Sequence, residues 1–382
     1  MAVGFPTKAN WAAGDVLTAS AQDDLAGTVN LLSNASAASG SQLVSNVAGT
    51  SFAYQATPSA SNPILNAGMQ VWQRGTTSAD SVGSPYTADR WQMIRSSVAG
   101  ATTTRQVTGD TTNLPNIQYC ARVQRNSGNT GTQIIYFAQT LETVNSIPFT
   151  AKTVTVSFYA RKGANYSEAS SYVNANLSYG TGTDQSIATG LTGQTTVIST
   201  NATLTTTWQR FTMTGTVSAT STQLALYFSY GPVGTAGAND YFEITGVQLD
   251  IGSVALPFRT YAATYQGELA ACQRYYFRNN NSSVSYITFC PAVANTSTQA
   301  SGILQFPVPM RIPPSTFEYS NLAFENYGGT QYALSALAIT AVTVTTIGTR
   351  ISGTISGATA GHAGYINGQN SSSAYLAVSA EL

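Results

Sequence analysis

Side chains that can carry acid–base, nucleophilic or metal chemistry are few in this sequence. Charged residues make up 8% of its 382 residues, and the single histidine, His362, lies in a glycine-rich stretch with no second histidine to share a metal. The sequence contains no nucleophile elbow, phosphate-binding loop or dinucleotide-binding fingerprint. It therefore predicts a protein that is not an enzyme and that requires no cofactor.

Carboxylates leave one route to catalysis open. Cleavage of a glycosidic bond needs two carboxyl groups that face one cleft, roughly 5–10 Å apart. The local groupings are Asp80 with Asp89, Asp240 with Glu243 and Asp250, and Glu318 with Glu325. Asp240 and Asp250 flank a strand-like segment, where they suit either turns or a structural Ca²⁺ site made of carboxylate and carbonyl oxygens. The sequence does not decide whether two of these carboxylates share a cleft, or whether Asp240 and Asp250 bind Ca²⁺.

Aromatic residues give the better functional lead, because sugar rings present apolar C–H faces that stack on Tyr and Trp. Trp72, Trp91 and Trp208 lie within strand-like patterns, so we expect them to pack in a core. Tyrosines beside amide side chains in turn-like, Gly- and Asn-rich stretches suit a sugar-binding surface instead. These candidate carbohydrate-binding residues are Tyr327, Tyr332, Tyr365, Asn367 and Asn370. Packing of the same residues against a neighbouring subunit is the alternative.

The composition predicts the kind of scaffold that must hold these residues. Hydrophobic residues make up 43% of the chain, and Thr, Ser, Asn, Gly and Ala replace the missing charge. Such a composition is typical of β-sheet faces and turns. The 21 Tyr, 14 Phe and 4 Trp argue against a disordered chain.

The charge balance narrows the possible partners. Sixteen basic and sixteen acidic residues cancel, so we expect no nucleic-acid partner and no attraction to an anionic membrane. No apolar run approaches the length of a membrane span or a signal peptide, which predicts no membrane insertion. Few lysines protect the edges of the sheets, so we expect a closed homo-oligomer that buries them. The low charge, an apolar stripe near the N-terminus and the resemblance described below together predict that this oligomer is a trimer.

The middle of the chain shows strand-like segments at regular intervals with no helix between them. Residues 153–160 alternate well, with Val154, Val156 and Phe158 on one face. This pattern predicts an all-β fold in which residues 62–262 form an antiparallel jelly-roll β-sandwich. The expected strands are Gln118–Gln124, Thr132–Gln139, Thr153–Ala160, Tyr172–Ser178, Trp208–Val217, Gln223–Tyr230 and Tyr241–Leu249.

The spacing turns helical just after the jelly roll. Tyr265, Leu269, Cys272 and Tyr276 fall at i, i+4, i+7 and i+11, which predicts one apolar stripe on a short helix. We expect Leu269, Cys272 and Tyr276 to be buried where two β domains join, so that Leu269→Ala costs about 2–5 kcal/mol.

Two further residues support this joining helix. Thr264 suits the N-cap, and Glu268 lies early in the helix, where the helix dipole favours a carboxylate. Residues 263–382 then comprise this helix and a smaller distal β-sandwich, because strand-like segments interrupted by prolines follow. The three cysteines, Cys120, Cys272 and Cys290, show no metal-binding spacing and are expected to be reduced and buried.

Residues 1–61 are expected to attach the protein to other proteins and to contact other copies of this chain. Phe5 and Trp11 are the bulky anchors, and Leu25, Val29 and Leu32 recur at helical spacing. The stripe suits either a short coiled-coil seam between copies or a lone helix docked on its own domain. The Ala/Ser/Asn-rich stretch over 33–61 is predicted to be a linker or extended stem.

Three segments, in order, resemble structural proteins of tailed bacteriophages, chiefly tail fibres and receptor-binding proteins. They are "NPILNAGMQVWQRGTT…YTADRW" over 62–91, "VQLDIGSVALPFR" with "TYQGELAACQRYYF" over 247–277, and "FPVPMRIPPSTF" over 306–317. "WAAGDVLTA" near the N-terminus is similar to segments by which phage fibre proteins attach to the particle. The layout of the jelly roll also resembles carbohydrate-binding modules.

The resemblance implies a virion component that is assembled in the cytoplasm of a host bacterium. It implies attachment to other virion proteins through the N-terminus and contact with host cell-surface glycans through the distal domain. Two alternatives remain open. One is a purely structural decoration or adaptor protein of the phage head or tail, and the other is a glycan depolymerase.

Overall fold

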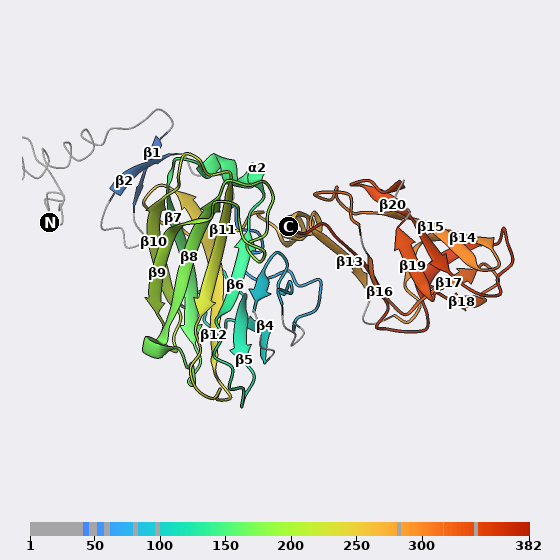
Figure 1. The fold of residues 1–382 in the computed structure, drawn as a ribbon, viewed down its shortest axis with the longest axis horizontal. Helices are drawn as coiled ribbons and strands as arrows, with labels where there is room; N and C mark the ends of the chain where they lie inside the picture. The colour runs from blue at the N-terminus through green and yellow to red at the C-terminus, as the bar shows by residue number, and fades with distance from the viewer. Residues whose placement is uncertain are drawn as a thin grey trace, which may run out of the picture.

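The computed structural model describes residues 41–45, 52–56, 62–78, 83–95, 100–280, 284–315, 317–339 and 343–382. Every strand pairing described in these ranges is antiparallel, and the ribbon is built almost wholly of sheets (Figure 1). The predicted all-β class is confirmed. No helix among the described residues is long and apolar enough to cross a membrane.

Two five-stranded sheets stack to form the jelly-roll sandwich. One sheet has the strand order β10-β7-β12-β5-β4, and the other has the order β3-β6-β11-β8-β9. Their strands are β3 (Gln92–Ile94), β4 (Ala101–Val107), β5 (Tyr119–Arg125), β6 (Ile135–Thr140), β7 (Thr153–Lys162), β8 (Tyr172–Gly180), β9 (Thr195–Thr203), β10 (Gln209–Thr216), β11 (Gln223–Tyr230) and β12 (Tyr241–Ile251). Short helical turns over Thr143–Ser146 (α2), Ile147–Phe149 and Ala169–Ser171 connect some of them.

The core of the sandwich lies between these sheets, where the apolar faces predicted from alternation meet. Val154, Val156 and Phe158 of β7 are buried there. The ring of Trp91 stacks on Phe137 at a centroid distance of 4.8 Å. Trp72, Trp91 and Trp208 are all buried, which confirms their assignment to the core.

Strands β3, β4 and β9 were not among the expected strands, although all seven of those expected are present. Each of the three lies at an edge of its sheet. An edge strand pairs on one side only and packs fewer apolar side chains, so its sequence lacks a clear alternation. The Thr- and Ser-rich strand β9 is mostly exposed for this reason.

A short helix, α3 (Tyr265–Gln273), follows the jelly roll as the spacing predicted. Thr264 caps it, because the Thr264 hydroxyl accepts a hydrogen bond from Gly267 N at 3.2 Å. Cys272 and Tyr276 are buried, but Tyr276 lies beyond the helix, at the start of β13 (Tyr276–Asn280). The expected burial of Leu269 is wrong, since its side chain is only partly buried.

Glu268 turns inward in place of the predicted apolar stripe. It is 2% exposed. Its carboxylate accepts hydrogen bonds from Asn66 N at 2.5 Å and from Ala262 N at 3.0 Å. The helix therefore presents a carboxylate to the first residues of the jelly roll, and Tyr265, which began the predicted stripe, is 51% exposed.

The C-terminal end of the chain lies near helix α3, between the jelly roll and the distal region (Figure 1). Glu381 forms ion pairs with Arg90 and, at 3.4 Å, with Arg74. The Arg74 guanidinium lies 3.4 Å from the ring centre of Tyr276, and that of Arg90 lies 3.6 Å from Tyr275. These cation–π and ionic contacts join the jelly roll to the distal region in addition to the covalent connection.

Two sheets make up the distal region. A three-stranded sheet has the order β13-β22-β16, and a seven-stranded sheet has the order β18-β17-β21-β14-β15-β20-β19. The strands are β14 (Thr288–Thr296), β15 (Gln299–Gln305), β16 (Phe317–Ser320), β17 (Leu322–Asn326), β18 (Gln331–Ala333), β19 (Ala336–Ile339), β20 (Gly348–Thr354), β21 (Ala363–Gly368) and β22 (Tyr375–Ser379). Their inner faces bury two apolar clusters, one around Leu376 and Ile366 and one around Phe324.

A β-hairpin formed by β1 (Ser41–Ser45) and β2 (Phe52–Ala56) lies in the stretch that was expected to be a linker or stem. The sequence analysis did not predict it. The candidate attachment and oligomer residues Phe5, Trp11, Leu25, Val29 and Leu32 lie outside the described residues.

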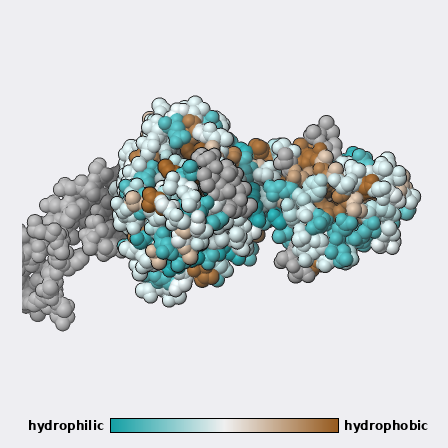
Figure 2. Space-filling model, turned by 60° about the horizontal axis from the view of Figure 1, so that its bottom comes forward, coloured by the Kyte–Doolittle hydropathy of each residue, from teal (hydrophilic) through white to brown (hydrophobic). Residues whose placement is uncertain are grey.

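The surface reflects the low charge content. In Figure 2 most described residues on the visible face are pale, with scattered teal and brown patches. All three cysteines are free and buried, as expected.

Candidate functional site

The solvent-facing side of the seven-stranded sheet brings together polar residues from neighbouring strands. Glu325 of β17 pairs with Gln331 of β18 on one side and with Tyr365 of β21 on the other. Asn367, two residues further along β21, pairs with Thr288 of β14. Because side chains two residues apart in a strand share a face, these residues form one polar surface.

This surface is hollowed. The hollow has a volume of about 510 Å³, within the range of small-molecule sites. It is lined by Tyr286, Thr288, Glu325, Gly329, Gln331, Tyr365 and Asn367.

Glu325 is the centre of the hydrogen bonding in the hollow. Its Oε2 accepts from Asn367 Nδ2 at 2.7 Å and from Gln331 Nε2 at 2.9 Å, and its Oε1 accepts from the Tyr365 hydroxyl at 3.1 Å. Partial burial alone would raise the pKa of Glu325, but these three hydrogen bonds together hold it below its usual range. The carboxylate is therefore ionised near neutral pH.

The ring of Tyr365 lies beside the carboxylate, and the ring of Tyr327 lies beside that of Tyr365. The ring of Tyr327 is 78% exposed and meets Tyr365 edge to face, with centroids 6.1 Å apart and planes at 86°. Tyr327 is held in place by its backbone N–H, which donates to the carbonyl of Ala363 at 3.3 Å. The Gly329 φ of 80° allows the tight turn after Tyr327.

The structure brings together some of the predicted sugar-binding residues and separates others. Tyr365 and Asn367 line the hollow, and Tyr327 borders it through Tyr365. Tyr332 is misassigned, because alternation along β18 places Gln331 on the outer face and turns Tyr332 inward. There its ring stacks on Phe324 at 6.1 Å.

Asn370 is also misplaced by the sequence analysis. It is exposed, has a φ of 44° and does not line the hollow. Asn tolerates this left-handed conformation, so Asn370 serves the turn after β21. The residues that the sequence analysis missed are Tyr286, Thr288, Gly329 and Gln331. The positions of Thr288 and Gln331 follow from strand register, for which no local pattern gives a signal, and Tyr286 and Gly329 lie in the loops next to these strands.

The predicted pair Glu318 with Glu325 does not meet in one site. Glu318 lies on β16 in the other sheet and accepts a hydrogen bond from the Tyr276 hydroxyl at 2.9 Å. The hollow is thus lined by a single carboxylate. A pair of carboxylates in one cleft, as glycoside hydrolysis needs, is not formed by its lining residues.

Three buried carboxylates of the jelly roll are paired with arginines. Asp240 and Glu243 are fully buried, and so is Asp250. Asp240 contacts Arg125 at 2.9 Å, and Asp250 contacts Arg259 at 2.7 Å. Glu243 contacts Arg122 at 2.6 Å and Arg161 at 2.5 Å.

These pairings favour a structural role over the Ca²⁺ role considered from the sequence, since the arginines already neutralise the carboxylates. No group of three or more His, Cys, Asp or Glu residues suited to a metal occurs in the part of the chain that the structure describes. Asp89 is buried and bonded to Gln73, while Asp80 falls outside the described residues.

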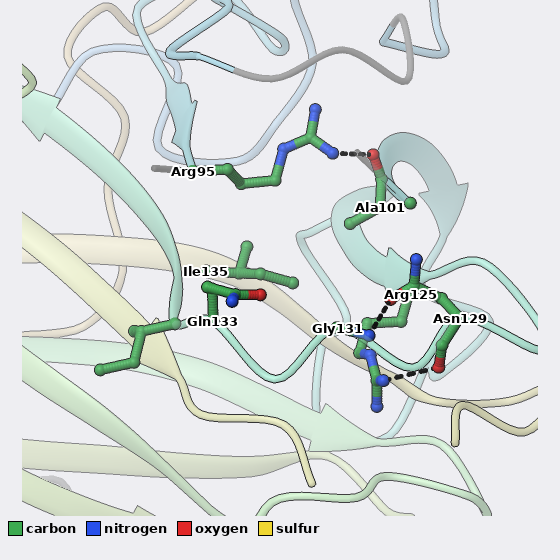
Figure 3. Close-up of a pocket in the computed structure, with 9 residues that line it drawn as sticks. Arg95, Ala101, Arg125, Asn129, Gly131, Gln133 and Ile135 are labelled. Atoms are coloured by element: carbon green, nitrogen blue, oxygen red, sulfur yellow. Dashed lines mark hydrogen bonds between the residues drawn. The ribbon is translucent and has the colours of Figure 1, made fainter. Parts of the chain in front are cut away.

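A second, much smaller hollow lies in the jelly roll (Figure 3). Arg95 donates to the carbonyl of Ala101 at 2.9 Å there, and Arg125 donates to the carbonyl of Asn129 at 2.7 Å. Its volume of about 10 Å³ leaves room for about one water molecule. It is too small for a sugar.

The jelly roll also carries a polar face. On the sheet of β6, β11, β8 and β9, the rings of Tyr136 and Tyr227 meet edge to face at 6.1 Å. Beside them Asn174 Nδ2 donates to Asn201 Oδ1 at 2.7 Å, and Asn176 Nδ2 donates to Asn174 Oδ1 at 2.5 Å. The sequence analysis did not single out these residues.

No protein-family model and no curated protein matches the sequence. Among solved structures, the enzymatically active domain of tailspike protein 4 of bacteriophage CBA120 is 12% identical over 50% of this chain and 21% of that chain, with a TM-score of 0.32. A cyclase from Fischerella sp. is 13% identical over 52% of this chain and 99% of that chain, with a TM-score of 0.34. A carbohydrate-binding module, CBM4, is 19% identical over 40% of this chain and 87% of that chain, with a TM-score of 0.26.

The matched region spans 21% of the length of the tailspike domain. At these identities and scores, nothing about the function of this chain follows from the likenesses.

Proposed function

We propose that this protein is a structural component of a bacteriophage virion, a tail fibre or receptor-binding protein that binds host surface glycans through the outer face of its distal sheet. The observation that carries the glycan-binding part is the hollow around Glu325, with the rings of Tyr365 and Tyr327 beside it. Aromatic faces next to a fixed array of hydrogen-bonding groups provide both halves of sugar recognition, stacking on C–H faces and bonding to hydroxyls. The virion part rests on the three sequence segments that resemble phage tail proteins.

Binding to glycans is tested with the full-length protein and two single substitutions. Tyr327→Ala and Tyr365→Ala should each weaken binding to host cells by about tenfold or more, because an aromatic contact at the centre of a site carries much of the binding energy. Tyr265→Ala removes another exposed tyrosine, 51% exposed, from helix α3 outside the hollow and serves as the control. Equal binding by all three variants would contradict the assignment of the site.

Point substitutions are preferable to fragments cut near residue 260. Glu381 of the distal region contacts Arg74 and Arg90 of the jelly roll, and Glu268 contacts Asn66. Separating the two regions would expose these buried charges and tyrosines to water. Loss of binding by a fragment would then report unfolding rather than the location of the site.

The jelly-roll face with Tyr136 and Tyr227 is a second candidate glycan surface, favoured by its own tyrosine pair and its row of asparagines. Tyr227→Ala in the full-length protein distinguishes the two faces. Weaker binding by Tyr227→Ala together with unchanged binding by Tyr365→Ala would mean that the receptor site lies on the jelly roll.

The proposed assembly is a homotrimer that attaches to other virion proteins through residues 1–61. A low surface charge and unprotected sheet edges support association. Several copies would convert weak single sites into firm attachment through multivalency. Light scattering of the full-length protein should give three times the mass of the chain, and a monomer at micromolar concentration would contradict the assembly.

The two alternatives predict different outcomes. A depolymerase would shorten capsule polysaccharide or lipopolysaccharide during incubation with the purified protein. Any reproducible cleavage would contradict the proposed binding-only function and favour the depolymerase. A decoration or adaptor protein would bind neither cells nor glycans in any variant.

A further inference from the structure

The hollow in the distal sheet contains an ionised carboxylate with no cation beside it. None of its seven lining residues is Lys or Arg. After residue 275 the sequence has no lysine and three arginines, Arg278, Arg311 and Arg350. Arg278 belongs to β13 in the other sheet, where its guanidinium lies 3.7 Å from the ring centre of Tyr375. Arg311 lies at the joint, where it donates to the carbonyls of Ala380 and Glu381.

Arg350 is distant from the hollow as well. It belongs to β20, which lies four strands away from β17 in the sheet. At about 4.8 Å between neighbouring strands, β20 and β17 are roughly 19 Å apart along the sheet. Its guanidinium donates to Ser301 at 3.2 Å. The negative charge of Glu325 is therefore uncompensated by the described part of the distal region.

The hydrogen-bonding pattern leaves acceptor capacity in the hollow. A carboxylate has about four lone-pair positions, and three neutral donors occupy three of those on Glu325. The free position is on Oε1. The Tyr365 hydroxyl gives its proton to Glu325, so its oxygen can accept from a ligand. An arrangement rich in acceptors favours a ligand that donates.

Resting on the proposed glycan-binding function, we propose that the hollow selects amino sugars whose amino group is free and protonated. The ammonium would donate to Glu325 Oε1, and its charge would be attracted to the faces of Tyr327 and Tyr365. The apolar face of the same sugar ring would lie against one of these tyrosines. Glu325 thereby becomes the residue that determines specificity.

The same arrangement disfavours acidic sugars. A uronic acid would bring a second carboxylate towards Glu325, where the hollow offers no cation to balance it. An N-acetylated sugar has no charge and loses the ionic contact, but it retains the stacking and the bonds from its hydroxyls. The expected order of affinity is free amine, then N-acetylated sugar, then uronic acid.

The test compares three oligosaccharides of equal length by calorimetry on the full-length protein. The probes are a glucosamine tetramer, its N-acetylated counterpart and a galacturonate tetramer, at about pH 5, where the sugar amines, although less basic than the amine of lysine, are protonated and Glu325 is ionised. The glucosamine tetramer should bind about tenfold or more tighter than the galacturonate, since charge-assisted hydrogen bonds are about twice as strong as neutral ones. Added salt should weaken the binding of the amine and leave that of the N-acetylated tetramer nearly unchanged.

Glu325→Gln removes the charge while keeping the hydrogen bonds. The Gln oxygen can accept from Asn367 and Gln331, and its amide can donate to the Tyr365 hydroxyl. This variant should bind the amine and the N-acetylated tetramer within about twofold of each other. Glu318→Gln makes the same change outside the hollow and should retain the preference.

The outcomes separate this inference from the function on which it rests. Equal binding of amine and N-acetylated tetramers to the wild type, with loss in Tyr365→Ala, would overturn the amine preference and leave the glycan site standing. A preference that persists in Glu325→Gln would overturn the role of Glu325. Binding of none of the three tetramers at millimolar concentration would overturn both proposals.

Discussion

The jelly roll and the distal sheet use carboxylates in opposite ways. In the jelly roll, Asp240 has no solvent exposure and is held by Arg125 at 2.9 Å. In the distal sheet, Glu325 is partly exposed and is held only by neutral donors. A fully buried charge must be paired, because an isolated ion in a low-dielectric interior is costly. A charge at a solvated surface needs no partner, so Glu325 stays available to a ligand.

Asp240, Glu243 and Asp250 differ from Glu325 in their partners and not in their place in the fold, since all four lie on or beside strands. Asp240, Glu243 and Asp250 each contact an arginine, whereas the bonds to Glu325 come from two amides and a tyrosine.

Removal of Asp240 should have the largest effect on stability. Asp240→Ala leaves the Arg125 guanidinium, which is 1% exposed, without its counter-ion, and deletes an acceptor for Ser167 N. We expect the free energy of unfolding to fall by about 3–5 kcal/mol. Urea denaturation measures it, with Glu325→Ala as the matched substitution in the distal sheet. Similar losses in both variants would contradict the distinction between the two regions.

The buried carboxylate of Asp89 should make the joint between the regions sensitive to pH. Burial raises the pKa of Asp89 to about 6. In the unfolded chain the same group titrates near about 3.9, so between these values the folded protein binds more protons. Its stability should therefore fall as the pH rises from about 4 to about 6, by about 3 kcal/mol in total, and the Asp89 contribution should be constant above that window.

Asp89→Asn isolates this contribution. The variant should differ from the wild type by a constant offset in unfolding free energy, because Gln73 donates to both oxygens of Asp89. The prediction concerns the slope: the difference in unfolding free energy between variant and wild type should change across the window. Parallel curves from thermal denaturation at several pH values would show that Asp89 titrates as it does in the unfolded chain.

The sequence predicts those features of the structure whose pattern lies within a single segment of the chain. Alternation in β7 and the helical spacing before Cys272 are local, and both elements are present. The edge strand β9 was missed because it buries little apolar surface. Tyr365 and Asn367 were found because they lie in a stretch rich in Gly and Asn. Gln331 was missed, and Tyr332 was misassigned. Only the register of β18 against β17 decides which of these two neighbours faces outward.

Helix α3 offers a smaller effect that contrasts a polar contact with an apolar one. Glu268→Ala leaves the backbone N–H groups of Asn66 and Ala262 without their acceptor, which should cost about 1–3 kcal/mol. Leu269→Ala should cost about 1 kcal/mol or less, below the range for a fully packed leucine, because its side chain is partly exposed. Chemical denaturation of both variants measures the order, and a larger loss for Leu269→Ala would reverse it.

The smallest expected change in stability comes from Tyr365→Phe, which keeps the ring and removes one hydroxyl at a solvated surface. Surface substitutions of this kind usually change stability by less than about 0.5 kcal/mol. The hydroxyl donates to Glu325 Oε1, so its loss should raise the pKa of Glu325 towards the ordinary value. Titration of the Glu325 carboxyl carbon by NMR measures this shift. Tyr327→Phe is the matched control, because Tyr327 contacts Tyr365 by its ring. An unchanged pKa in Tyr365→Phe would mean that the two amides alone hold the carboxylate ionised, and that Tyr365 contributes only its ring to the hollow.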